Sequence, residues 1–241
     1  MPKQPQECGI FQRNREAKGI SFVRVFADHA RNLLPFTFLS GTTMKTSALF
    51  LAAVLFSCLP LLAQLPTDSP VEVIRHPVWN KGVFVGGSTS FANTPSAQTL
   101  LLGMRVGRVL TNEHGSGIFR GTYEMAFDVI PLNEFWYDGN AQYAGAIDPF
   151  IAKWNFTNCC KVAPYIAAVG GIVFSSSNLP PGDTSQVNFT SGVEVGAQVF
   201  RPERRSVDLA VKIYHLSNAS LGNKNPGING TVQFTVGYTW H

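Results

Sequence analysis

Apolar and polar residues alternate along most of the chain after residue 78. Eight runs show this pattern, and they span 79–92, 98–110, 116–130, 142–154, 161–174, 187–200, 205–216 and 229–240. Turn-forming residues such as Thr94-Pro95-Ser96, Asp138-Gly139-Asn140 and Pro180-Pro181-Gly182 separate the runs. Successive side chains of a strand point to opposite faces, so alternation with a period of two predicts strands. No long window shows the period of a helix, and the pattern therefore predicts an all-β fold of eight strands.

The two faces of these strands differ in charge. The polar face carries the charged residues Arg105, Glu124, Asp128, Glu194, Asp208 and Lys212. Such residues can pair with one another inside a narrow barrel, while the apolar face contacts lipid. Runs of about 10–14 residues are long enough to cross a bilayer at a tilt. We therefore expect an eight-stranded antiparallel outer-membrane β-barrel. A soluble lipocalin-like barrel, with the apolar face inward, is the alternative, and solubility only in detergent would exclude it.

The composition agrees with a folded, β-rich protein. Of 241 residues, 45% are hydrophobic and 14% are charged, and the chain contains 22 glycines and 18 phenylalanines. Low charge with many aromatic residues argues against disorder. The net charge of +4 comes partly from the first 43 residues, so it does not indicate a nucleic-acid partner.

A secretory signal peptide is predicted at residues 44–63. Met44-Lys45 is followed by an apolar stretch and by Ala63, where cleavage would leave a mature barrel domain of residues 64–241. A lipoprotein acylated at Cys58 is an alternative. Residues 1–43 would then be an upstream extension from a wrongly assigned start codon, with Met44 the true start, although a nucleic-acid-binding arm remains the other interpretation. Of the four cysteines, only the adjacent Cys159 and Cys160 follow the cleavage site, and we interpret them as turn residues.

A histidine and a serine lie two residues apart at the end of the seventh run. His215 and Ser217 continue the parity of Leu209 and Ile213, so both side chains should lie at the rim of the apolar face. A serine hydroxyl beside an imidazole can act as a nucleophile, because the ring accepts the hydroxyl proton during attack. The alternative is that both are ordinary polar groups of the barrel rim.

The surrounding residues resemble a known family. His215-Leu216-Ser217-Asn218-Ala219, followed by Gly222, Asn225-Pro226-Gly227-Ile228 and a final aromatic strand, resembles the motif of the lipid A 3-O-deacylases, the PagL family. The resemblance implies an outer-membrane serine esterase that removes the 3-O-linked hydroxyacyl chain of lipid A in lipopolysaccharide. It makes Ser217 the nucleophile and His215 the base, and it places Asn218 and Asn225 in substrate or oxyanion binding. It further implies a homodimer, and this chemistry requires neither a metal nor a cofactor.

The chain departs from the family motif at the third catalytic position. A glutamate supports the histidine in the family, whereas the matching residue here is Asn229. Asparagine can accept a hydrogen bond from the ring but cannot stabilise imidazolium with a charge. Strict alternation would turn Asn229 inward unless Gly230 forms a bulge. This departure keeps a second interpretation open, namely a non-catalytic outer-membrane barrel that binds lipopolysaccharide or has a structural role.

Overall fold

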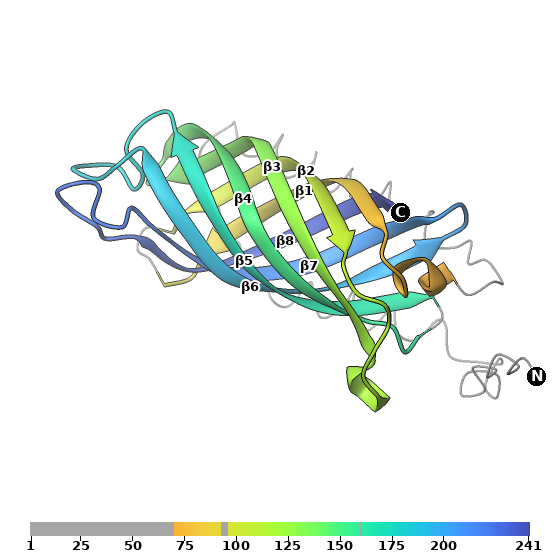
Figure 1. Cartoon of the computed structure of the whole chain (residues 1–241). Coiled ribbons are helices and arrows are strands. Elements are labelled where there is room, and N and C mark those ends of the chain that lie inside the picture. Colours follow the sequence, from red (N-terminus) through yellow and green to blue (C-terminus); the bar gives the residue numbers. More distant parts are fainter. Residues whose placement is uncertain (1–69, 93–95, 160) are drawn as a thin grey trace, which may run out of the picture. The chain divides into compact units, whose positions relative to one another are not determined.

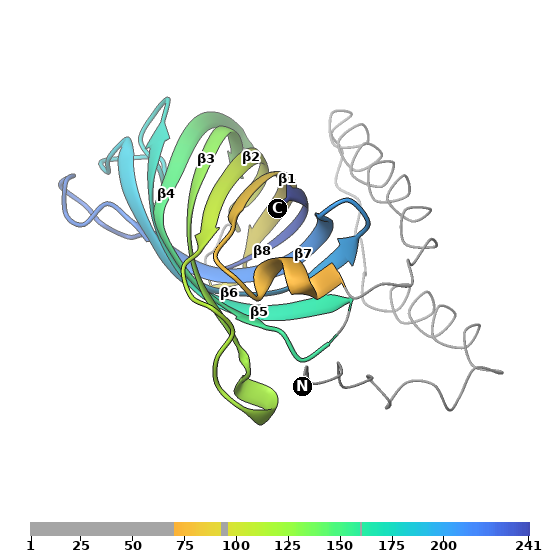
Figure 2. The same ribbon diagram turned by 45° about the vertical axis from the view of Figure 1, so that its right-hand side comes forward.

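The computed structural model describes residues 70–92, 96–159 and 161–241, which form one closed β-barrel (Figure 1). Its elements are the 3-10 helices η2 (Pro70–Ile74) and η3 (Gly117–Phe119) and the strands β1 (Trp79–Ser90), β2 (Gln98–Val109), β3 (Gly121–Tyr137), β4 (Asn140–Phe156), β5 (Val162–Ser175), β6 (Val187–Arg201), β7 (Arg205–Ser217) and β8 (Ile228–Trp240). Each strand pairs antiparallel with the next, and β8 closes onto β1 (Figure 2). The prediction of an eight-stranded antiparallel barrel is confirmed. Within the described residues, no helix is both long and apolar enough to cross a membrane.

The predicted upstream extension (1–43) and signal peptide (44–63) lie outside the described residues, as do Cys58 and Cys160. Cys159, at the connection between β4 and β5, is exposed and has a free thiol.

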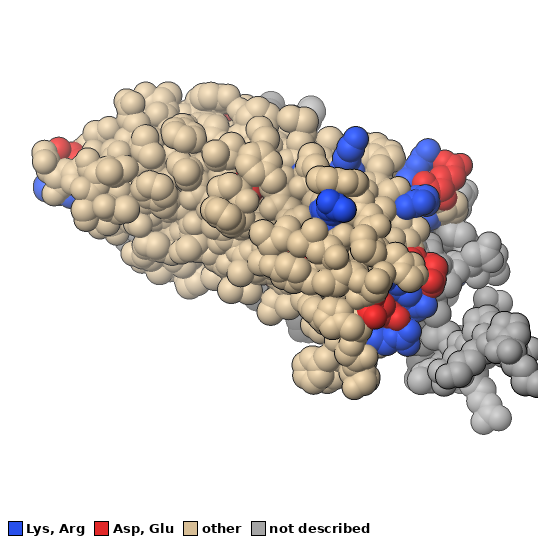
Figure 3. Space-filling model, viewed as in Figure 1, with Lys and Arg blue, Asp and Glu red and all other residues tan. Residues whose placement is uncertain are grey.

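The outer face of the barrel is apolar, as the alternation predicts. Ile213, Val193 and Phe234 are 54%, 51% and 60% exposed, whereas the intervening Lys212 and Glu194 are 7% and 2% exposed. The space-filling view shows a long uncharged flank with charged residues gathered at the two ends (Figure 3). A soluble lipocalin-like barrel would have these faces reversed.

Ion pairs fill the middle of the barrel. The Arg105 guanidinium bonds Asp128 at 2.8 Å and Glu194 at 3.1 Å, so two carboxylates share one cation. Two lysines neutralise further carboxylates, in the pairs Lys153–Glu124 at 3.3 Å and Lys212–Asp148 at 3.2 Å. The cavities beside Arg105 measure only about 20 and 10 Å³. The interior is therefore a packed polar core rather than a channel.

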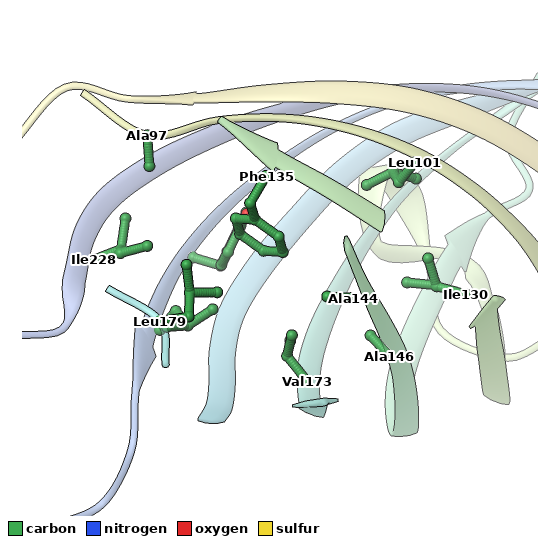
Figure 4. Close-up of a cluster of buried hydrophobic side chains, with 11 residues drawn as sticks. Ala97, Leu101, Ile130, Phe135, Ala144, Ala146, Val173, Leu179 and Ile228 are labelled. Carbon is green, nitrogen blue, oxygen red and sulfur yellow. The ribbon is translucent and has the colours of Figure 1, made fainter. Parts of the chain in front are cut away.

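An apolar cluster closes the barrel at one end, which we call the loop end. It is the end of the connections β1–β2 (91–97), β3–β4 (138–139), β5–β6 (176–186) and β7–β8 (218–227). Leu179 from the β5–β6 connection packs there with Phe135 and Ile228 (Figure 4). The cluster also buries Leu216, which is paired with Ile228. It thus fixes the backbone around the predicted site.

The third strand differs from its predicted range of 116–130. It begins later, at Gly121, because Gly117 has a φ of +57° and starts the short helix η3. It also continues through Pro131 to Tyr137, seven residues beyond the predicted end. Proline lacks the N–H that a paired strand donates, yet a register irregularity between Ile130 and Asn133 accommodates it. The turn predicted at Asp138-Gly139 is correct, and both residues have positive φ.

The opposite end of the barrel holds a half-buried histidine that follows β8. The His241 ring stacks on Phe200 with 5.0 Å between ring centroids. Its nitrogens lie 2.8 Å from Asn80 Oδ1 and 3.0 Å from Ser206 Oγ. Burial, together with the positive charge of Lys153, lowers the pKa of His241 to about 4. The ring is therefore neutral in the folded barrel at pH 7.

We expect acidification to destabilise the barrel through His241. Unfolded histidine binds a proton near pH 6.5, whereas the folded ring binds one only near pH 4, so stability falls as the pH drops through this window. The loss approaches about 3 kcal/mol between pH 7 and pH 4, since one pKa unit corresponds to about 1.4 kcal/mol. Thermal unfolding of the folded protein in detergent at pH 7 and pH 4.5 measures it. His241→Gln, which has no titrating ring, should lose less stability, and an equal loss in both proteins would contradict the assignment.

Candidate active site

The predicted nucleophile and base lie on the outer face of β7 at the loop end. His215 is exposed and Ser217 is half-buried, while Leu216 between them is 1% exposed. Across the strand pair, Ser217 lies opposite Phe189 of β6, whose side chain is 38% exposed on the same face. The structure therefore places His215 and Ser217 at the rim of the apolar face, as predicted. Among the described residues, no hydrogen bond joins Ser217 to His215, and such bonds often form only around substrate.

A β-bulge in β8 turns Asn229 to the same side as His215. Tyr214 pairs with Thr231 and Leu216 with Ile228, so two residues of β8 oppose His215 alone. The extra residue is accommodated at Gly230, whose φ of +58° is disfavoured for other residues. As a result Ile228 is buried and Asn229 is exposed. Asn229 therefore does not point inward, as strict alternation would require. The bulge at Gly230, which the sequence analysis gave as the exception, is present.

Gly227 lies between the imidazole of His215 and the amide of Asn229. A Cβ at this position would lie 3.1 Å from His215 Cε1 and 3.8 Å from Asn229 Oδ1. It would also lie 2.9 Å from the carbonyl oxygen of Leu216. Gly227 has a φ of +65°, which glycine adopts without strain. The motif glycine therefore provides both the backbone turn and the space in which His215 and Asn229 approach each other.

Replacing Gly227 with alanine should reduce both activity and stability. We expect a stability loss of about 1–2 kcal/mol from the left-handed backbone and a 10- to 100-fold loss of kcat, since the methyl group displaces the His215 ring. Gly139→Ala is the matched control, because Gly139 has a φ of +74° and nothing lies within 4 Å of its added Cβ. Unfolding and deacylation assays on both variants measure the two effects. An unchanged kcat in Gly227→Ala would show that the His215 ring position does not limit the reaction.

The two asparagines predicted for substrate or oxyanion binding hold the β7–β8 connection together. Asn218 is 2% exposed, its Nδ2 donates to the carbonyl oxygen of Lys224 at 2.9 Å, and its Oδ1 accepts from the N–H of Ser220 at 2.9 Å. The N–H of Asn218 donates to Asn225 Oδ1 at 3.0 Å. The side chain of Asn218 is thus occupied within the loop. Asn225 is exposed and uses its carbonyl, which leaves its amide N–H groups as donors.

The residues after Ser217 have an unusual backbone. Ala219 and Ser220 have φ values of +49° and +66°, a region that costs an L-residue about 1 kcal/mol or more. The hydrogen bonds of Asn218 offset this cost. Strained backbone of this kind is concentrated at functional sites.

A contact from the β5–β6 connection supports this loop, and the sequence analysis missed it. Asn223 Nδ2 donates to both oxygens of the Asp183 carboxylate, at 3.0 and 3.2 Å, and the N–H of Lys224 donates to the Asp183 carbonyl oxygen at 2.9 Å. Asp183 directly follows the predicted turn Pro180-Pro181-Gly182, and nothing else in the sequence indicated this contact. Among the described residues, no cluster of three or more His, Cys, Asp or Glu side chains could hold a metal ion.

The family model for lipid A 3-O-deacylase (PagL) matches residues 111–239, which is more than half of the chain and includes His215, Ser217 and Asn229. The chain belongs to the PagL family. The model carries the description lipid A 3-O-deacylase, and the resemblance inferred from the motif is confirmed. A search of curated proteins found no match.

Three solved barrels are similar to this chain. The outer membrane enzyme PagL is 19% identical, with a TM-score of 0.44, and covers 67% of this chain and 99% of its own. Neisserial surface protein A is 13% identical, with a TM-score of 0.48, and covers 68% and 97%. The N-terminal β-barrel domain of Pseudomonas aeruginosa OprF is 15% identical, with a TM-score of 0.39, and covers 67% and 97%.

Proposed function

We propose that this PagL-family barrel is an outer-membrane serine esterase that removes the 3-O-linked hydroxyacyl chain from lipid A. The observation that carries the proposal is the position of Ser217 and His215, side by side on the apolar outer face at the loop end. An ester just below the headgroup of a membrane lipid would lie at this level. The acyl chain would remain against apolar side chains of the barrel wall, such as Phe189.

The apolar outer surface supports the membrane location. Side chains exposed by 40% or more include Val106, Phe174, Val193, Ile213 and Phe234, on five different strands. Exposed apolar surface on this scale is characteristic of a membrane or protein interface. Trp79 and Trp240 are 57% and 46% exposed at the end of the barrel opposite the loop end. At that level they would form an aromatic belt at the membrane surface.

The proposed reaction uses side chains of this chain and one water molecule. Ser217 Oγ attacks the ester carbonyl carbon while the His215 ring accepts the hydroxyl proton. The bond between the acyl carbon and the 3-oxygen of the sugar then breaks, and the ring returns the proton to this leaving oxygen. A water molecule, deprotonated by the same ring, releases the hydroxy fatty acid from Ser217. The free amide N–H groups of Asn225 are the candidate donors to the oxyanion, and such a donor contributes roughly 3–4 kcal/mol.

Asn229 takes the place of the acidic third residue in this proposal. The outward bulge lets its carbonyl accept a hydrogen bond from the His215 ring, which fixes the orientation of the ring without adding charge. The absence of charge favours a second candidate function, a barrel that binds lipopolysaccharide without cleaving it.

Incubating the detergent-folded mature protein with lipid A tests the proposal. We expect mass spectrometry to show the loss of one hydroxyacyl chain, released as a free hydroxy fatty acid. Heat-modifiable gel mobility should confirm that the barrel is folded in the assay. Unchanged lipid A in the presence of folded protein would contradict the esterase and support the binding barrel.

A further inference from the structure

A polar cleft at the loop end has no role in the reaction above. It lies between the start of β4 and the β5–β6 connection and has a volume of about 640 Å³. None of its eight lining residues is charged, and four are carboxamides: Asn140, Gln142, Asn178 and Gln186. Carboxamides both donate and accept hydrogen bonds. The cleft is therefore suited to a ligand that carries many hydroxyl groups and no charge.

Hydrogen bonds fix the walls of this amide cleft. Gln142 Nε2 donates to the carbonyl oxygen of Asn178 at 3.3 Å, which joins β4 to the β5–β6 connection. Asn178 Nδ2 donates to the carbonyl oxygen of Gly182 at 2.9 Å. Ser175 Oγ donates to the carbonyl oxygen of Gln186 at 3.1 Å and ties the other side of the connection. The cleft is thus formed before a ligand binds, which lowers the entropic cost of binding.

One amide oxygen in the wall of the cleft lacks a donor. Gln142 Oε1 is buried, and no group of the described residues donates a hydrogen bond to it. A buried acceptor without a partner is costly, at about 1–3 kcal/mol, unless a ligand or water supplies the donor. A sugar hydroxyl would supply the donor once the Gln142 amide turns toward the cleft.

The charges around the cleft disfavour phosphate. Two acidic residues lie next to cleft residues. Asn140 Nδ2 donates to the carbonyl oxygen of Asp138 on one side of the cleft, and Asp183 directly follows Gly182 on the other side. Lys224 is the one cation among the described residues of the four loop-end connections. Like charges repel, so an anionic group would gain little here.

The cleft and the candidate active site share one connection. The β5–β6 residues 176–186 form a wall of the cleft, and Asp183 in the same segment binds Asn223 and Lys224 of the loop that follows Ser217. Strands β4 and β7 are three strand spacings apart, or about 14 Å around the barrel. An oligosaccharide attached to a lipid at Ser217 can cover this distance.

We propose that the amide cleft binds uncharged sugar residues of the lipopolysaccharide on which the active site acts. The inference rests on the proposed function, which supplies the substrate. The sugars come either from the core oligosaccharide or from the glucosamine backbone of lipid A, and both offer the same hydroxyl chemistry. Binding there would anchor the headgroup while the ester lies against Ser217.

Sugar binding to the folded Ser217→Ala barrel tests this inference without turnover. The two probes are core oligosaccharide free of lipid and the N-acetylated, dephosphorylated glucosamine disaccharide without its fatty acyl chains, each titrated by NMR or calorimetry. In the same background, Gln142→Leu removes the unpaired acceptor at similar volume and should weaken binding about 10-fold. Gln186→Ala is a second variant in case Gln142→Leu does not fold. Gln98→Ala, an exposed glutamine at the start of β2 outside the cleft, is the matched control and should change nothing.

Binding of one probe identifies which part of lipopolysaccharide occupies the cleft. Binding of neither sugar, or binding that both cleft variants leave unchanged, would overturn the inference. The result does not depend on catalysis, so an inactive wild-type protein would overturn the esterase and leave the sugar site standing. Deacylation of lipid A without sugar binding would overturn only the sugar site.

Discussion

Ser217→Ala should lower the kcat/KM for lipid A deacylation by at least about 1000-fold while the barrel still folds. The hydroxyl is the only protein group of the proposed mechanism that forms a bond to the acyl carbon, and removing a nucleophile in a complete triad costs up to about 10⁶-fold in kcat. The loss expected here is smaller, because Asn229 supplies no charge and the wild-type enzyme therefore has less of its rate to lose. Mass spectrometry of the hydroxy fatty acid released over time measures the rate of the wild-type protein and that of Ser217→Ala.

Ser191 provides the matched control for this prediction. It lies directly opposite His215 on β6 and is exposed on the same outer face, so it is the serine of the adjacent strand nearest to the base in register. Ser191→Ala should keep kcat/KM within about 2-fold of wild type. If activity instead depends on Ser191 and survives Ser217→Ala, the nucleophile assignment is wrong. Circular dichroism and heat-modifiable mobility on both variants exclude misfolding as the cause.

The barrel could be predicted from the sequence because its alternation is strict. In β6, Val193 and Val195 point outward at 51% and 50% exposure, and Glu194 between them is buried. A shift of one residue would put Glu194 into lipid, so burial fixes the register. Pro131 shows where such reasoning fails. A proline usually ends a strand, and only pairing on both sides showed that the chain continues through an irregularity.

The candidate site could be predicted in part. His215 and Ser217 lie on one strand, and the parity of β7 was sufficient to place both at the outer rim. Asn229 lies across a bulge, where the parity of β8 is interrupted, so its orientation could be stated only as conditional on Gly230. The contacts of Asp183 join two connections about 40 residues apart. No local pattern predicts such a contact, since it depends on how the barrel brings the connections together.

Asn229→Glu should increase kcat for deacylation by about 100-fold. In serine proteases the reverse change, from aspartate to asparagine, lowers kcat by about 10⁴, because the charge stabilises the imidazolium and fixes the ring tautomer. Asn229 is exposed, so water weakens the effect of the new charge, and we expect only part of that range. The outward bulge gives the longer glutamate side chain room. Because Gly227 has no side chain, the glutamate can reach the His215 ring.

Asn229→Gln separates charge from length in this experiment. Glutamine has the shape of glutamate without its charge, so it should leave kcat near or below the wild-type value. A gain in Asn229→Glu alone would show that the site lacks only a carboxylate and that asparagine maintains a slower form of the same enzyme. Equal rates in wild type and both variants would mean that Asn229 does not act on the His215 ring. Because the mutated residue neither attacks the ester nor transfers its proton, the change should appear in kcat while KM stays nearly constant.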